Sequence, residues 1–157
     1  MRLSFQTGLS FGLTSGIITT LGLIVGLNAG THSRLPVIGG ILTIAVADAF
    51  SDALGIHISQ EARPGSTFRD IWESTISAWL AKFFITVTFI IPVILLDLSQ
   101  AIIFSIIWGI TILTFFSYLI ARHKKESPGF VIMEHISIAV IVILLSHLIG
   151  VYISRKF

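Results

Sequence analysis

Five apolar stretches, each about 20 residues long, dominate this chain of 157 residues. They cover residues 9–27, 37–58, 79–96, 101–121 and 130–153. An α-helix of about 20 residues spans the hydrocarbon core of a bilayer, so each stretch is long enough to cross it. Only 11% of the residues are charged, whereas a soluble domain carries about 25%. The sequence therefore predicts an all-α integral membrane protein, a single membrane domain of five transmembrane helices.

The segments between these stretches are too short for a soluble domain. In the longest, residues 60–78, we expect a helix to begin, capped by Ser66 or Thr67 with Asp70 in its first turn. The N-terminus lacks a compact apolar core followed by an A-x-A-like site, so we expect it to be retained. The absence of cysteine excludes disulfides and thiolate metal sites, and the scattered basic residues argue against a nucleic-acid partner.

Lysine and arginine are distributed unevenly between the two sides of the predicted membrane domain. The side of the N-terminus carries Arg2, Arg63, Arg69, Lys82, Arg122, Lys124 and Lys125, and the opposite side carries Arg34, Arg155 and Lys156. Because cytoplasmic loops are enriched in these residues, we expect the N-terminus in the cytoplasm and the C-terminus outside. Lys82 lies slightly inside the third stretch, so we expect its side chain to snorkel to the membrane surface.

Asp48 and Asp52 lie one helical turn apart inside the second apolar stretch. Four residues at about 100° each leave the two side chains about 40° apart, so both carboxylates share one face. A carboxylate at this depth costs about 2.5–3.5 kcal/mol, so the pair must face a partner, a cation or water. The other residues of this arc are small and let another helix approach: Ala45, Gly55 and Ser59, with Ser51 at its edge.

Paired carboxylates inside a membrane suit a site for a divalent cation. Their oxygens are ligands of ions such as Mn²⁺, Fe²⁺, Mg²⁺ and Ca²⁺. Without metal, two neighbouring carboxyl groups in a low dielectric do not both ionise, so metal binding would expel protons. The pair Asp48 and Asp52 therefore predicts a metal site and favours metal–proton exchange. The alternative is a structural pair of protonated acids in a non-transporting scaffold or regulatory subunit.

Small residues recur at spacings of three and four along the first stretch, which favours close helix packing. They are Gly8, Gly12, Ser15, Thr19, Gly22 and Gly26. Packing alone explains the glycines. The hydroxyl groups of Ser15 and Thr19, like those of Ser51 and Ser59 on the second stretch, are also candidate contacts along an ion pathway.

Three acids follow the second stretch on the predicted cytoplasmic side: Glu61, Asp70 and Glu73. They are candidates for a cation entrance, although a solvated helix face paired with Arg63 and Arg69 is the simpler interpretation. An intramembrane aspartyl protease would also place two acids in a membrane. Its Y-D and G-x-G-D motifs on separate helices are absent here, so we do not expect an enzyme.

Two motifs in the first 60 residues resemble the vacuolar iron transporter family. Residues 11–20 read FGLTSGIITT and residues 23–26 read LIVG, similar to that family's first-helix signature F-G-A-N-D-G-L-V-S-T with its following hydrophobic run and glycine. Residues 47–52, ADAFSD, resemble the S-M-A-A-G-E segment of the second helix, with the same spacing between two metal-pathway positions. The rest of the chain resembles the family by architecture.

This resemblance implies a homodimer that moves divalent iron or manganese out of the cytoplasm along the dimer interface in exchange for protons. The two-fold axis would bring two copies of Asp48 and Asp52 together. Ser15 stands where the family has an aspartate, Asp48 where it has methionine and Asp52 where it has glutamate, which shifts the ligands toward hard oxygen. The family's glutamate-rich cytoplasmic insert is missing.

We therefore expect a transporter of divalent cations, Fe²⁺ or Mn²⁺ foremost, in the plasma membrane of a prokaryote. Its expected partners are the lipid bilayer, protons and a second protomer. No permanently bound cofactor is expected.

Overall fold

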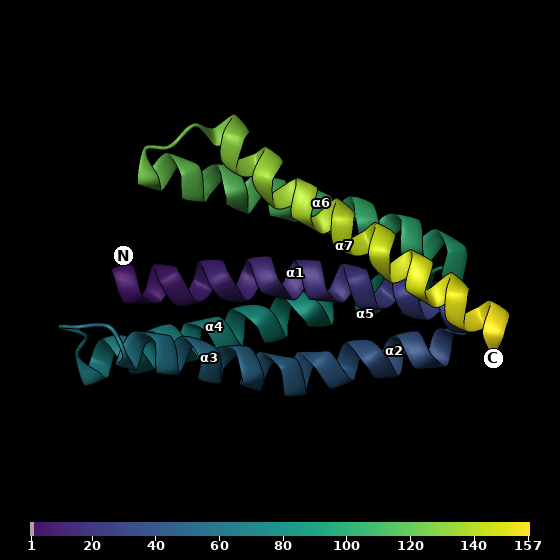
Figure 1. Ribbon diagram of the computed structural model, residues 1–157, viewed down its shortest axis with the longest axis horizontal. Coiled ribbons are helices and arrows are strands. Elements are labelled where there is room, and N and C mark those ends of the chain that lie inside the picture. Colours follow the sequence, from purple (N-terminus) through teal and green to yellow (C-terminus); the bar gives the residue numbers. More distant parts are fainter. Residues whose placement is uncertain (1) are drawn as a thin grey trace.

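The computed structural model describes residues 2–157, and these form helices and no strand. Five helical rods run back and forth along one axis (Figure 1). They are α1 (Leu3–Thr31), α2–η1–α3 (Arg34–Thr43, Ile44–Asp48 and Ala49–Glu61), α4–α5 (Phe68–Thr88 and Ile90–Leu95), α6 (Leu98–Lys124) and α7 (Pro128–Lys156). Each rod is long and apolar enough to cross a membrane. The predicted all-helical class with five such rods is confirmed, and the two termini lie at opposite ends of the bundle.

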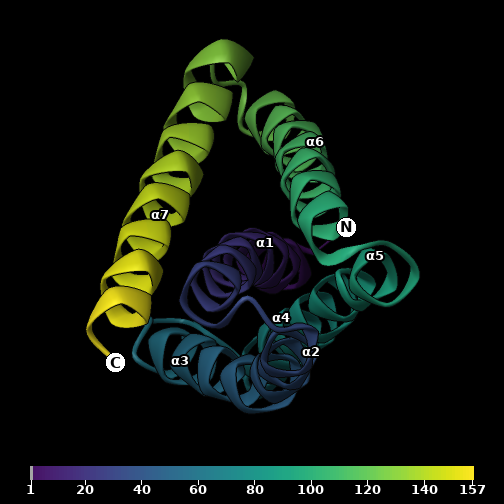
Figure 2. The ribbon, with the colours of Figure 1, turned by 90° about the vertical axis from the view of Figure 1, so that its right-hand side faces the viewer.

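The first helix, α1, lies in the middle of the bundle with the other rods around it (Figure 2). Its first half packs closely on α4. A Cβ atom at Gly8 would lie only 2.1 Å from the carbonyl oxygen of Ser74, so a larger residue does not fit there. Its second half packs on α7, where a Cβ atom at Gly150 would lie 2.4 Å from the carbonyl oxygen of Gly26. Glycines thus permit two close helix contacts, one toward each end of α1.

Aliphatic and aromatic side chains from all five rods fill the core between these contacts. Ile17 and Leu21 of α1, Ile41 of α2, Phe89 after α4 and Leu113 of α6 are among its buried members. The α6–α7 hairpin diverges from α1 toward the turn that joins the two helices (Figure 1). Much of α7 is therefore exposed, and its exposed side chains are largely apolar, as expected of a surface that faces lipid.

Two local features match their sequence signals. Thr67 caps α4 through a reciprocal capping box with Asp70, which confirms the predicted helix start. The rod then breaks at Phe89, whose backbone N–H donates to the carbonyl oxygen of Thr86 at 3.1 Å. Pro92 explains the break, since its ring carries no N–H and crowds the carbonyl group four residues earlier.

Candidate functional site

Lys82 of α4 is the one charged residue among the buried side chains of residues 2–157, with 1% of its surface exposed. Its Nζ donates to Oδ2 of Asp52 at 2.5 Å and forms an ion pair with Oδ2 of Asp48. The prediction that Lys82 snorkels to the membrane surface is therefore wrong. Its aliphatic stem packs against Gly16 of α1, and its ammonium group reaches the two carboxylates, where ion pairing takes the place of hydration.

Ser15 of α1 joins the same group of side chains. Its Oγ donates to Oδ2 of Asp52 at 2.6 Å and accepts a hydrogen bond from Nζ of Lys82 at 3.0 Å. We call Ser15, Asp48, Asp52 and Lys82 the Asp–Lys cluster. Three rods contribute to it, and the close packing of α1 on α4 brings Ser15 and Lys82 within reach of each other.

Asp48 lies halfway along its rod, and Asp52 follows one turn later. Asp48 is 14 residues beyond Arg34 and 13 residues before Glu61, which places it about 20 Å from either end. Asp48 also closes η1, a single π-helical turn between α2 and α3. Such turns widen the helix locally and are frequent at functional sites. If the rod spans a bilayer, the cluster lies near the middle of the hydrocarbon.

With both acids ionised, as a bound metal would require, the charges of the cluster do not balance, because two carboxylates face one ammonium group. The hydrogen bonds and ion-pair contacts of the two carboxylates go to Oδ2, and neither Oδ1 accepts a hydrogen bond within residues 2–157. The side chains of Asp48 and Asp52 are 33% and 20% exposed. Within the described chain, no further Asp, Glu, His or Cys joins them in a group of three that could hold a metal ion. One protomer thus presents an open, singly negative half-site.

A row of small side chains borders this half-site on the outer surface of the rod. We call it the outer stripe; all of its members are exposed and four residues apart: Gly39, Thr43, Ala47, Ser51, Gly55 and Ser59. A Cβ atom at Gly39 or Gly55 would meet nothing within 4 Å. Large apolar side chains flank the stripe, among them Phe50 and Leu54. Small exposed side chains allow another helix to approach closely.

The other predicted site residues lie apart from the cluster. Thr19, one turn beyond Ser15, is half-buried and forms no hydrogen bond with it. Ser51 and Ser59 belong to the exposed outer stripe, and neither hydroxyl group forms a hydrogen bond with the cluster within residues 2–157. Of the predicted packing glycines, Gly8 and Gly12 lie against α4, while Gly22 and Gly26 lie against α7.

The three acids predicted as a cation entrance lie at the end of the bundle that holds the N-terminus. Glu61 is exposed at the last position of α3, and Asp70 is occupied with the cap of α4. Glu73 accepts a hydrogen bond from Ser4 at 2.8 Å and pairs with Arg2 at 3.7 Å. The expected arginine partners, Arg63 and Arg69, form no ion pair with these acids within residues 2–157.

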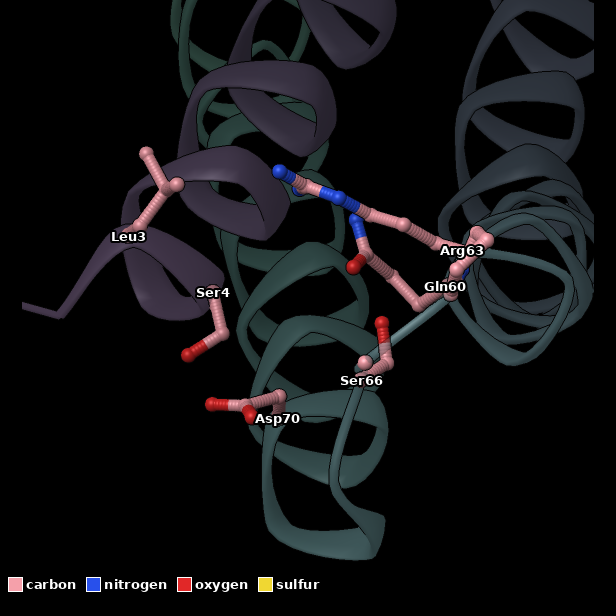
Figure 3. Close-up of a pocket in the computed structure, with 8 residues that line it drawn as sticks. Leu3, Ser4, Gln60, Arg63, Ser66 and Asp70 are labelled. Carbon is pink, nitrogen blue, oxygen red and sulfur yellow. The ribbon is translucent and has the colours of Figure 1, made fainter.

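A polar pocket of about 240 Å³ opens at the same end (Figure 3). Asp70, Ser4 and the side chains of Gln60 and Arg63 line it, and the guanidinium group extends across it toward α1. Gln60 lies two turns of α3 beyond Asp52, about 12 Å along the axis. The pocket is therefore separate from the Asp–Lys cluster.

Reasoning on the sequence did not place Lys82 at this candidate site. Its signal was present, because Lys82 is the only charged residue between Glu73 and Asp97 and the second rod holds two unpaired acids. Charged groups inside a membrane pair with one another, so the sequence could have predicted Lys82 as the partner of Asp48 and Asp52.

Comparison with models of known protein families finds none that matches this chain, and comparison with curated proteins finds no match either. The likeness to the vacuolar iron transporter family therefore remains a prediction that rests on the two motifs.

Proposed function

We propose that the protein is a membrane transporter of divalent metal cations, Fe²⁺ or Mn²⁺ foremost, which binds its substrate at Asp48 and Asp52 between two protomers. One observation carries the proposal: two carboxylates lie well inside a membrane-length rod, Asp48 at its midpoint and Asp52 one turn later, and both remain partly exposed beside the outer stripe. Lipid cannot solvate such groups, so they need a second protein surface or a cation.

A second copy of the chain would supply the protein surface and complete a site for the cation. Paired on their outer stripes, two protomers would place their half-sites face to face, because a two-fold axis matches each surface to itself. The stripe's small side chains support a close approach of the two rods. Four carboxylates and two ammonium groups would then sum to two negative charges, which one divalent cation neutralises.

The ligands support the choice of substrate class. The Oδ1 atoms of Asp48 and Asp52, which accept no hydrogen bond within residues 2–157, would offer four carboxylate oxygens in two copies. Hard and borderline divalent ions prefer such ligands. When the ion leaves, two protons restore the same neutrality, which favours exchange of metal for protons.

The proposal also includes the orientation of the chain in the membrane and the membrane in which it lies. The excess of lysine and arginine on the side of the N-terminus supports a cytoplasmic N-terminus and an outward-facing C-terminus. In a prokaryotic plasma membrane, the transporter would then carry cations from the cytoplasm across the membrane.

The test is transport by the purified chain in proteoliposomes. We expect Mn²⁺ or Fe²⁺ flux with an accompanying change in internal pH, and at least about a tenfold loss of flux for Asp48→Asn and for Asp52→Asn, since each removes a ligand. Asp97→Asn is the matched control, because Asp97 is exposed between α5 and α6. Flux that is unchanged in both site variants would refute the metal site, and flux without a pH change would refute proton exchange.

A structural role is the competing function, and the ion pairs of Lys82 favour it because they already hold both Oδ2 atoms. A scaffold or regulatory subunit needs no metal. Specific binding to the folded state raises thermal stability. A melting temperature in detergent that no divalent cation shifts would therefore support the scaffold.

A further inference from the structure

We infer that Lys82 is a tethered cation that limits how tightly, and in what number, divalent ions bind the Asp48–Asp52 site. The inference rests on the proposed function, and it assigns to Lys82 a role in specificity. Its ammonium group occupies the inner oxygens of both carboxylates, so an incoming metal ion finds half of the site's negative charge already neutralised.

On the three rods that form the cluster, Asp48 and Asp52 are the charged residues nearest to the ammonium group of Lys82. Between Leu3 and Thr31, α1 holds no charged residue, and the rod from Arg34 to Glu61 has no charged residue between its ends other than the two aspartates. In α4 the nearest charged residue is Glu73, nine residues earlier, which pairs with Arg2. The sign and size of the charge at the cluster therefore depend on Lys82.

Burial strengthens the electrostatic effect of the Lys82 charge on the two carboxylates. Lys82 is 1% exposed, and Coulomb interactions in such surroundings are several times stronger than in water. With Lys82, two facing half-sites carry two negative charges, enough for one divalent ion. Without it they would carry four, enough for two ions, each held more tightly.

A purely structural role of Lys82 predicts the opposite change in metal affinity. If Lys82 only holds the rods together, its removal leaves two uncompensated carboxylates, loosens the α3–α4 contact and weakens metal binding. The two roles thus differ in the sign of the change in affinity.

The experiment measures Mn²⁺ binding to the full-length chain in detergent, as affinity and as ions bound per chain. For Lys82→Met we expect affinity to rise on the order of tenfold or more, equal to about 1.4 kcal/mol. The bound ions should rise from about one per two chains toward one per chain, because the charge available doubles. Lys82→Arg keeps the positive charge and should bind Mn²⁺ no more tightly than the parent.

A second pair of variants covers the case in which Lys82→Met does not fold. Asp48→Asn leaves Asp52 neutralised by Lys82, so we expect it to lose Mn²⁺ binding. Adding Lys82→Met to that variant restores the parent's net charge and should restore binding. Adding Lys82→Arg should not.

The outcomes separate the two proposals. If the parent binds Mn²⁺ but neither Lys82→Met nor the Asp48→Asn/Lys82→Met pair gains affinity, the role of Lys82 is refuted and the metal site stands. If Asp48→Asn binds Mn²⁺ as the parent does, the charge argument is also refuted. If neither the parent nor any variant binds Mn²⁺, the proposed function itself fails.

Discussion

Ser15 connects the opposite charges of the Asp–Lys cluster, because its hydroxyl group donates to Asp52 and accepts from Lys82. A hydrogen bond to a charged group contributes more than one between neutral groups. The neighbouring small residues of α1 serve packing, whereas Ser15 also orients a carboxylate. At this scale the cluster is a network of one hydroxyl, two carboxylates and one ammonium group.

Replacing Ser15 by alanine should lower the free energy of unfolding by about 1.5 kcal/mol, since Asp52 and Lys82 each lose a hydrogen bond. Thermal and denaturant unfolding in detergent measure the change. Ser10→Ala is the matched control, because Ser10 lies on the same helix, is half-buried and has no side-chain hydrogen bond within residues 2–157. Equal stabilities of the two variants would contradict a role for Ser15 in the network.

The sequence predicted Asp48 and Asp52 as a pair but assigned Lys82 to the membrane surface. An intramembrane acid is recognisable from its apolar neighbours alone. The partner of Lys82 is not, because a lysine near the end of an apolar stretch can reach water or turn inward. Only the packing of α1 against α4 and α3 shows which it does.

Among the helices, the contact between α1 and α4 positions the cluster. A Cβ atom at Gly12 would lie 2.3 Å from the carbonyl oxygen of Ala78, so the two backbones touch there. Ser15 follows Gly12 by one turn, and Lys82 follows Ala78 by one turn. The spacing of these two helices therefore controls the distance between Ser15 and Lys82.

Gly12→Ala should destabilise the protein by about 1–3 kcal/mol, because the added methyl group forces α1 away from α4. Separation of the helices should also weaken Mn²⁺ binding at the cluster. Unfolding in detergent and Mn²⁺ titration measure the two effects. Gly55→Ala serves as the control, since a Cβ atom there meets nothing within 4 Å. A Gly12 variant as stable as the Gly55 variant would show that this contact is not tight.

For the whole molecule, the outer stripe is an exposed surface of small side chains beside the candidate site. It runs along a rod that also carries the two partly exposed carboxylates. We propose that a second protomer covers it, and this pairing would complete the metal site.

Gly55→Leu should disrupt the dimer and abolish transport while leaving the protomer folded, because the leucine side chain extends into space that is open in one protomer. Light scattering in detergent measures the oligomeric state, and helical circular dichroism measures folding. Gly129→Leu is the matched control, since Gly129 is equally open but lies at the start of α7. A Gly55 variant that remains dimeric and active would exclude the outer stripe as the interface.

By itself the sequence determined the five apolar rods, the capped start of α4 at Ser66 or Thr67 and the place of two acids well inside one rod. These properties depend on residues close together in the chain, through hydropathy, capping and helical rise. The tertiary structure alone decided that Lys82 turns inward to Asp48 and Asp52, and which face of their rod stays open. Both depend on how each helix is rotated about its axis, and contacts between distant segments set that rotation.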